Sequence, residues 1–254
     1  MKKKAYKNIP RVSEPVSGGT PVEHVPIPDL GREPIPKEKY ISQDYLETEW
    51  QSMWRKVWLL GALERDLAEP GDYVCTEIGR ESVILVRQKD DKIRAFYNVC
   101  PHRGNRLVPP GLSDEPTETF KCSYHGWEYA LNGRFVNIPN KELFPQGVPC
   151  SGLSEIPCEV WNNFVWFCLD KDPIPFEEYM APLKDHFEPY HFDRMVLTRD
   201  VTMEWNCNWK TSVDAFNETY HVAATHPQLL WYLDDMDVQI DCYERHSRYL
   251  VPFG

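Results

Sequence analysis

Two short motifs that pair a cysteine with a histidine constrain this chain more than any other feature of its sequence. The first is Cys100-Pro-His102, and the second is Cys122-Ser-Tyr-His125, with nineteen residues between His102 and Cys122. Thiolate and imidazole groups bind transition metals, and two such loops facing each other would place four ligands around one small centre. We therefore expect a fold in which the two motifs lie on opposing loops.

Two kinds of centre suit this ligand set. Zinc would take all four ligands on one tetrahedral ion, whereas a [2Fe-2S] cluster can take two cysteines on one iron and two histidines on the other. Each motif supplies one Cys and one His, so each loop has one ligand for each iron, which favours the cluster. A zinc-stabilised binding module remains the alternative.

The sequence around the motifs predicts an antiparallel β module over roughly residues 47–170. Asn132-Gly133 between two alternating runs is a strong hairpin signal. Short β-rich runs recur with turn residues between them: 72–78, 82–88, 93–99, 127–131, 134–138 and 158–169. The motifs then fall on loop tips between strands.

The flanking segments read differently. The first 40 residues contain seven prolines, which predicts an extended arm. A capping-type Ser42 precedes aromatic residues at helical spacing and predicts an amphipathic helix whose aromatics pack inward. Residues 171–187 predict a polar helix, 194–205 a strand, and 208–226 a helix that stops before Pro227.

The last predicted helix contains a second set of possible ligands. Asp214, Glu218 and His221 are spaced i, i+4, i+7 and would share one face. His221 and His226 are five residues apart, which leaves their side chains roughly 140° apart on an ideal helix. They can share a metal only if the helix bends or ends between them, and alone this pattern is a weak signal.

Composition excludes several classes of protein. The 254 residues carry a formal net charge of -11, and the only basic run is the initial MKKK, so no nucleic-acid surface is expected. No apolar segment follows that run, and the longest apolar stretch is too short for a bilayer. We expect a soluble, cytoplasmic protein that does not bind membranes, with Cys75 and Cys168 as buried thiols rather than disulfides.

At this point the motifs resemble a known family. CPHRGNRL and CSYHGWEYALNGRF resemble the signature of Rieske [2Fe-2S] centres in the version found in Rieske non-haem iron oxygenases. The resemblance implies a cluster held by Cys100, His102, Cys122 and His125. Respiratory Rieske proteins have a further cysteine in each loop, where this chain has Asn105 and Tyr124. With fewer hydrogen-bond donors expected around the sulfurs, we predict a low reduction potential for a Rieske centre.

Residues 208–226 resemble the mononuclear iron motif of the same family. This resemblance implies that His221 and His226 bind Fe(II), and that Glu218 links the iron site to the Rieske histidine of a neighbouring subunit. The family usually has Asp there, and Glu occurs in branches that oxidise quaternary amines. Asp214 is expected near the iron or facing solvent.

The third iron ligand of the family, a late carboxylate, has no counterpart in the sequence. The acidic residues that follow His226 are predicted to form a solvated turn instead: Asp234, Asp235, Asp237 and Asp241. Because the family's carboxylate comes well over a hundred residues after the second histidine, the chain is expected to be a C-terminally truncated α subunit that is inactive by itself if the iron site stays incomplete.

The resemblance implies an α+β fold of three parts. These are an extended arm (1–40), an antiparallel Rieske [2Fe-2S] domain with a flanking helix (41–171), and the incomplete start of a helix-grip-like α/β catalytic domain (172–254).

The implied function is that of a terminal oxygenase. A ferredoxin or flavin reductase would deliver electrons from NAD(P)H, and O₂ would hydroxylate or dihydroxylate a small organic substrate, with an aromatic compound favoured. The implied assembly is a homotrimer, with or without β subunits. The alternatives are an amine N-demethylase or monooxygenase of the same family and a Rieske electron-transfer protein without oxygenase activity.

Overall fold

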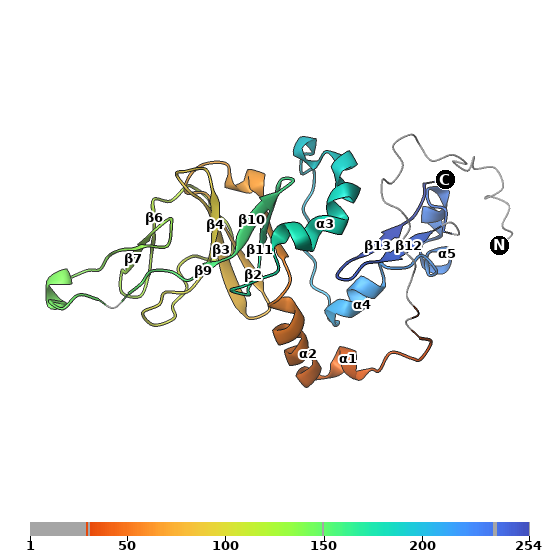
Figure 1. Cartoon of the computed structure of the whole chain (residues 1–254), viewed down its shortest axis with the longest axis horizontal. Coiled ribbons are helices and arrows are strands. Elements are labelled where there is room, and N and C mark those ends of the chain that lie inside the picture. The colour runs from red at the N-terminus through yellow and green to blue at the C-terminus, as the bar shows by residue number, and fades with distance from the viewer. Residues whose placement is uncertain (1–28, 30, 149, 236–237, 254) are drawn as a thin grey trace. The chain divides into compact units, whose positions relative to one another are not determined.

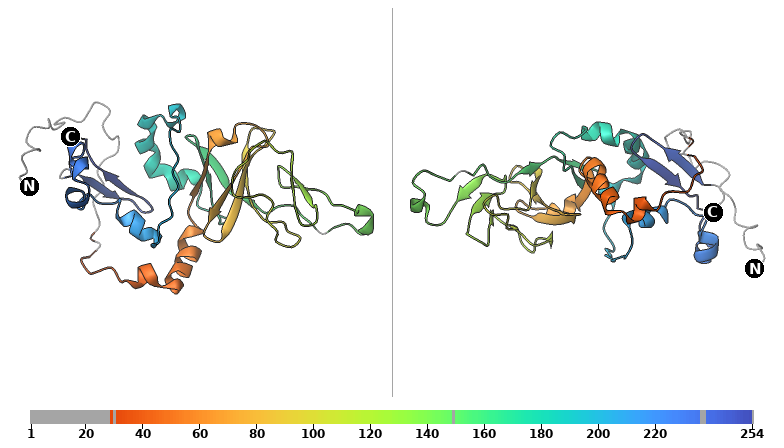
Figure 2. Two further views of the ribbon diagram at one scale, coloured as in Figure 1. Left: turned by 180° about the vertical axis from the view of Figure 1, so that it is seen from behind. Right: turned by 90° about the horizontal axis from the view of Figure 1, so that it is seen from below.

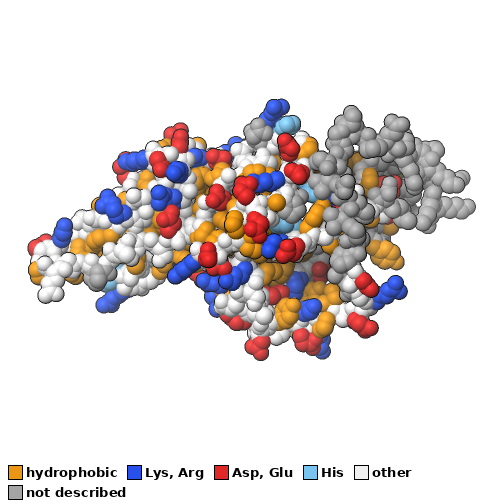
Figure 3. Space-filling model, viewed as in Figure 1, with side chains coloured by type: hydrophobic (Ala, Val, Ile, Leu, Met, Phe, Trp, Pro, Cys, Tyr) orange, Lys and Arg blue, Asp and Glu red, His pale blue; other side chains and the backbone are white. Residues whose placement is uncertain are grey.

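The computed structural model describes residues 29, 31–148, 150–235 and 238–253. Within them the chain forms two compact units: residues 47–176 with 192–194, and residues up to 46 with 177–191 and 195 onward. The first 28 residues of the predicted arm lie outside the described part. In the ranges that are described, no helix is long and apolar enough to cross a membrane. Acidic and basic side chains alternate over the face in Figure 3, with no basic stripe there.

The unit formed mainly by residues 47–176 consists of three antiparallel sheets (Figure 1). A five-stranded sheet has the order β5-β2-β3-β4-β9, and two three-stranded sheets have the orders β1-β11-β10 and β6-β7-β8. The strands are β1 Leu59–Leu63, β2 Tyr73–Ile78, β3 Glu81–Arg87, β4 Ile93–Tyr97, β5 Gly111–Leu112, β6 Thr119–Lys121, β7 Glu128–Ala130, β8 Phe135–Asn137, β9 Glu155–Ile156, β10 Cys158–Trp161 and β11 Phe164–Phe167.

The central strand β3 is buried on both faces. Successive side chains of a strand point to opposite sides, so Ile84 and Val86 enter one apolar core while Val83 and Leu85 enter another. The first core also contains Cys100 and Cys122, and the second contains Trp50 and residues of β11. The five-stranded sheet therefore supports the two cysteine motifs on one face and packs against the rest of its unit with the other.

Most of the predicted β module is confirmed. The runs expected as strands form β2, β3, β4, β7, β8 and the β10–β11 hairpin. At the predicted Asn132-Gly133 turn, Gly133 has φ +78°, and a Cβ atom there would lie 2.5 Å from Phe96 Cε1, so the turn requires glycine. The sequence reading missed β1, whose Gly61 lies against Leu85 and Phe167 side chains.

The helix expected after Ser42 is also present. It comprises α2 Gln43–Glu49, preceded by the short α1 Glu38–Ile41 and continued by a π-helical turn, Trp50–Trp54. Ser42 Oγ accepts a hydrogen bond from Tyr45 N at 3.2 Å, which satisfies a free N–H at the helix start. Trp50 is buried in the core, as its helical spacing predicted.

The second unit contains the remaining elements: α3 Phe176–Phe187, which starts at the unit boundary, α4 Trp209–Asp214, α5 Val222–Thr225, β12 Gln239–Cys242 and β13 Ser247–Leu250. α3 confirms the predicted polar helix. β12 and β13 form an antiparallel hairpin (Figure 2). Arg248 on β13 pairs with the fully buried Asp241 of β12, Nε to Oδ2 2.7 Å.

Three expectations for this unit were wrong. The strand predicted over 194–205 is absent, because its apolar side chains are exposed and no described strand pairs with it. The predicted helix over 208–226 is broken into α4 and α5. The predicted solvated acidic turn is also incorrect at Asp241, which is buried in an ion pair, while Asp237 lies outside the described residues.

Candidate metal centres

The two cysteine motifs adopt the same backbone turn. In each, the cysteine N–H donates to the carbonyl five residues later, Cys100 to Asn105 (2.8 Å) and Cys122 to Trp127 (2.7 Å). In each, a glycine four residues after the cysteine donates back to the cysteine carbonyl, both at 2.9 Å. Gly104 and Gly126 have φ values of +72° and +69°, which glycine adopts without strain. The sequence thus builds two matching loops, one between β4 and β5 and the other between β6 and β7.

The loops bury their sulfurs and expose their imidazoles. Cys100 and Cys122 are 1% and 2% exposed, whereas His102 and His125 lie on the surface. The two imidazole rings are neighbours, with centroids 4.7 Å apart. Trp127 stacks on His102 at a centroid distance of 4.5 Å with an interplanar angle of 1°, which holds that ring in place. The two thiols thus lie in one buried core, and the two imidazoles lie beside each other on the surface.

A hydrogen-bonding side chain lies beside each of the two thiols. Tyr129 Oη lies 3.1 Å from Cys100 Sγ, and Asn105 Nδ2 lies 3.6 Å from Cys122 Sγ. Burial and the bond to Cys100 raise the pKa of Tyr129 far above its ordinary value, so its hydroxyl keeps its proton. Each sulfur thus has at least one donor beside it, although few donors were expected. Neither contact could be predicted from the sequence pattern.

The electrostatics of the loops favour the metal-binding forms. Burial raises the pKa of the Cys122 thiol, but backbone N–H groups of Tyr124 and His125 outweigh it, and the net pKa is lowered. Partial desolvation, with His125 and Arg103 nearby, holds the pKa of His102 below its ordinary value. Thiolate and neutral imidazole are the forms that bind metal, so the residues present fit a [2Fe-2S] group with buried sulfur ligands and outward nitrogen ligands.

Asn98, which sequence reasoning missed, fixes the first loop. Its Nδ2 donates to Val108 O at 2.8 Å and to Ser82 Oγ at 3.1 Å. Its Oδ1 accepts from Leu107 N and Val108 N, at 3.0 and 3.1 Å. This buried carboxamide thus ties the returning arm of the loop to β3, and only the folded structure reveals it.

The second set of candidate ligands lies where the predicted helix breaks. Glu218 Oε2 accepts from His221 N at 3.1 Å, so a side chain satisfies the N–H at the start of α5 and the helix is interrupted there. The other Glu218 oxygen bonds His221 Nδ1. The rings of His221 and His226 are 5.4 Å apart between centroids. α5 ends at Thr225, and His226 has φ −126° and ψ 51°, so the helix ends between the two histidines as a shared metal would require.

The bond from Glu218 fixes the ring of His221. With Nδ1 engaged, Nε2 is the nitrogen left for a metal, which is the usual arrangement of a metal-binding histidine and its carboxylate partner. The hydrogen bond from His221 also lowers the pKa of Glu218, which keeps the carboxylate ionised. Among the described residues, no three His, Cys, Asp or Glu side chains lie close enough together to hold one ion. The described chain thus offers two nitrogen ligands here and no third ligand.

Asp214 lies apart from this pair. It ends α4 and is exposed, and its Oδ2 accepts from Tyr40 Oη at 2.7 Å. The expected common face of Asp214, Glu218 and His221 is absent because the helix is broken between them. Of the apolar side chains in the same region, Leu230 is buried, whereas Phe216, Leu229 and Trp231 are exposed.

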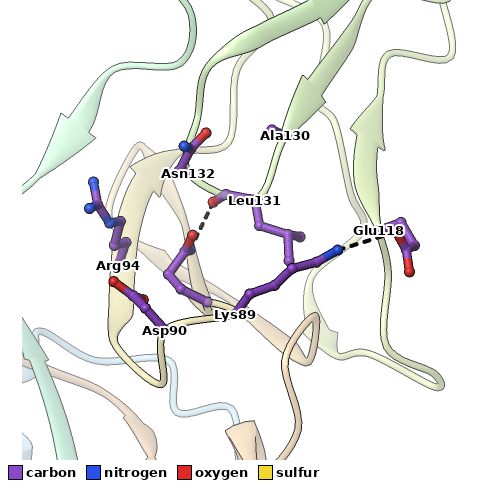
Figure 4. Close-up of a pocket in the computed structure, with 8 residues that line it drawn as sticks. Lys89, Asp90, Arg94, Glu118, Ala130, Leu131 and Asn132 are labelled. Atoms are coloured by element: carbon purple, nitrogen blue, oxygen red, sulfur yellow. Dashed lines mark hydrogen bonds and ion pairs between the residues drawn. The ribbon is translucent and has the colours of Figure 1, made fainter.

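The structure also has a surface pocket of about 360 Å³. It is bordered by the β3–β4 turn and the end of β7 (Figure 4), where Lys89 pairs with Glu118 at 3.6 Å and Gln88 Nε2 donates to Leu131 O at 2.8 Å. None of the predicted ligands lines it. It is therefore not a candidate for the metal chemistry.

Comparison with known families agrees with the two sets of ligands. Residues 57–150 match the family described as Rieske [2Fe-2S] domain, and residues 192–248 match the catalytic domain of the ring hydroxylating alpha subunit. The first match contains Cys100, His102, Cys122 and His125. The second contains Glu218, His221 and His226.

Individual relatives point the same way. The chain is 27% identical over 204 residues to the glycine betaine monooxygenase oxygenase subunit of Pseudomonas aeruginosa, covering 80% of this chain and 47% of that protein. It is 32% identical over 196 residues to the large oxygenase component of a naphthalene 1,2-dioxygenase system from the same species, covering 74% and 43%. The chain spans about half the length of these relatives.

A solved structure is similar as well. It is that of a quaternary ammonium Rieske monooxygenase, described in terms of carnitine oxidation by gut microbiota and inter-subunit electron transfer. The TM-score is 0.78 at 26% identity, and the match covers 84% of this chain and 59% of that one.

Proposed function

We propose that this chain, which belongs to the Rieske non-haem iron oxygenase α subunits, acts in the oxidation of a small organic substrate by O₂. When bound, a [2Fe-2S] cluster would supply single electrons and a mononuclear Fe(II) would supply O₂ activation. Cys100, His102, Cys122 and His125 would hold the cluster. His221 and His226 would contribute two of the iron ligands.

One observation supports this proposal most. Two neighbouring loops each carry a buried thiol and a surface imidazole, with the two imidazole rings in contact, and a separate carboxylate–histidine pair adjoins a second histidine. A Rieske electron carrier would need the first arrangement but has no use for the second. A zinc module would have no use for the Glu218–His221 pair beside His226.

The surface position of the cluster imidazoles suits electron transfer between protein chains. We propose that an external ferredoxin or flavin reductase delivers electrons to the cluster, and that Glu218 receives them from a cluster histidine of a neighbouring subunit. The inter-subunit electron transfer described for the structurally similar monooxygenase supports this route. A homotrimer with head-to-tail contacts would provide it, with or without β subunits.

The substrate is the finer part of the proposal. The relatives include an aromatic dioxygenase and quaternary amine monooxygenases. The resemblance of the sequence favours an aromatic substrate. A quaternary amine is favoured by Glu218, which stands where the family more usually has Asp, and by the glycine betaine relative. Oxidation of either substrate belongs to the same reaction class, so an activity assay is needed to distinguish them.

The test is NADH-driven O₂ consumption by the cluster-loaded chain with a supplied reductase. Carnitine and glycine betaine would be compared with naphthalene, and the oxidised product identified by mass spectrometry. Product formation coupled to O₂ uptake supports the proposal. Reduction of the cluster with no oxidised product from any substrate would favour the electron-carrier alternative.

A further inference from the structure

The two ligand loops are closed internally, and neither needs the other to hold its shape. Each makes its own pair of backbone hydrogen bonds between the cysteine and the residues four and five positions later. A cluster that takes one cysteine and one histidine from each loop requires the loops to stay at a fixed separation. Contacts between the two loops are therefore the ones that would fix their separation around a cluster.

The side chain of Asn105 makes such a contact. It belongs to the first loop, yet its Nδ2 lies 3.1 Å from Ser123 Oγ and 3.6 Å from Cys122 Sγ in the second loop. The same nitrogen lies 2.8 Å from Arg106 O. A carbonyl oxygen, a hydroxyl oxygen and a sulfur all accept hydrogen bonds, so the amide nitrogen rather than its oxygen belongs on this side.

The contact has an electrostatic consequence. A hydrogen bond to a ligand sulfur stabilises the more negative, reduced cluster over the oxidised one and so raises the reduction potential. Cys122 is 2% exposed, so water cannot readily replace a donor lost at that sulfur. Asn105 is thus placed to affect both the separation of the loops and the charge that the sulfur carries.

We propose that Asn105 is a positioning residue of the cluster: its carboxamide joins the two ligand loops through Ser123 and donates to the Cys122 sulfur, and it thereby sets cluster retention and reduction potential. This inference rests on the cluster of the proposed function. Mutation can separate the two contacts of Asn105. A change at Ser123 removes the contact with the Ser123 hydroxyl and leaves the contact with the Cys122 sulfur.

Three variants of the full chain test it. Asn105→Leu keeps the volume and neutrality of the side chain but has no donor. Ser123→Ala removes the hydroxyl and leaves the contact with Cys122. Asn137→Leu is the matched control, since Asn137 is an exposed asparagine at the end of β8, outside both loops. Each protein is loaded with iron and sulfide, and its midpoint potential and rate of iron loss to a chelator are measured.

Asn105→Leu is expected to have a lower midpoint potential and to lose iron about 10-fold faster or more, as for other groups that orient metal ligands. Ser123→Ala is expected to lose iron faster with a smaller change in potential, and Asn137→Leu to match the wild type. Wild-type potential and retention in Asn105→Leu would overturn the proposal.

Three further outcomes are decisive. If Asn105→Leu binds no cluster, Ser123→Ala decides: faster iron loss supports the proposal and wild-type retention overturns it. A wild-type chain that takes up no cluster overturns the proposed function together with this inference. A wild-type cluster that is indifferent to both loop variants overturns this inference alone.

Discussion

At the scale of single residues, the chemistry depends on a few side chains held by unlike partners. His102 is fixed by stacking on Trp127, whereas His221 is fixed by a carboxylate. Stacking leaves both ring nitrogens of His102 to other partners, and the carboxylate occupies one nitrogen of His221. The two histidines thus suit two tasks, ligation at a surface cluster and ligation at an iron linked to a carboxylate.

Glu218 provides a prediction at this scale. Glu218→Gln keeps the size of the side chain but removes the charge that orients His221, so substrate-coupled O₂ uptake should fall by about 10- to 100-fold. The EPR signal of the reduced cluster should not change, because Glu218 lies outside both cluster loops. Glu178→Gln, at an exposed position of α3, is the control. Turnover at the wild-type rate in Glu218→Gln would contradict the assigned role.

The sequence predicted the ligands better than it predicted the groups that hold them. Cys100, His102, Cys122 and His125 follow from spacing and family resemblance, and the structure places the two cysteines in one core and the two imidazoles in contact. Asn98 and Tyr129 could not be predicted, because their contacts depend on segments that come together only in the fold. Whether His221 and His226 bind iron remains a prediction that only metal analysis can test.

At the scale of elements, local signals succeeded where the chain pairs with itself nearby. The predicted Asn132-Gly133 turn joins β7 and β8, and its Gly133 has a positive φ value. The reading failed for residues 195–204 and for the helix over 208–226. No described strand pairs with residues 195–204, and the Glu218 side chain competes for a backbone N–H within the predicted helix. The periodicity of the apolar residues therefore could not predict the structure of either segment.

The β7–β8 hairpin gives a stability prediction. Gly133→Ala combines a positive φ with a clash against buried Phe96, so the free energy of unfolding should fall by about 3 kcal/mol. Gly147 has nearly the same φ, +77°, but nothing within 4 Å of the added Cβ. Gly147→Ala should therefore cost only about 1 kcal/mol. Equal urea midpoints for the two variants would refute the steric argument.

The packing of α3 on the β12–β13 hairpin predicts a pH dependence. Arg248 donates to His186 Nδ1 at 2.9 Å, so that nitrogen must stay unprotonated, and Nε2 then donates to Tyr243 Oη at 2.9 Å. Burial and Arg248 lower the pKa of His186. As pH falls below about 6.5, the unfolded chain binds a proton that the folded chain does not, so stability should fall until the folded pKa is reached.

His186→Asn checks this dependence. The Asn oxygen can accept from Arg248 but does not titrate, so the loss of stability between about pH 7 and pH 5 should be smaller than in the wild type. Urea unfolding at the two pH values measures it. An identical loss in both proteins would show that His186 makes no contribution.

At the scale of the whole molecule, the account requires cooperation between chains. Four side chains are predicted to hold the cluster, but only two histidines are predicted to hold the iron, and no third ligand lies close to them among the described residues. The chain spans about half the length of the relatives that it matches. Electron transfer between subunits makes a specific prediction. Cys122→Ser and His221→Ala should each be inactive alone, yet mixed oligomers formed by co-expression should regain part of the activity. Mixtures as inactive as the single variants would contradict transfer between subunits.

The central claim is that two matching loops hold an iron–sulfur cluster, and EPR of the dithionite-reduced protein together with analysis of iron and acid-labile sulfide tests it most directly. We predict about two sulfides per chain and a signal from one unpaired electron, both lost in Cys122→Ser. A colourless wild-type protein that contains zinc, no sulfide and no signal on reduction would contradict it.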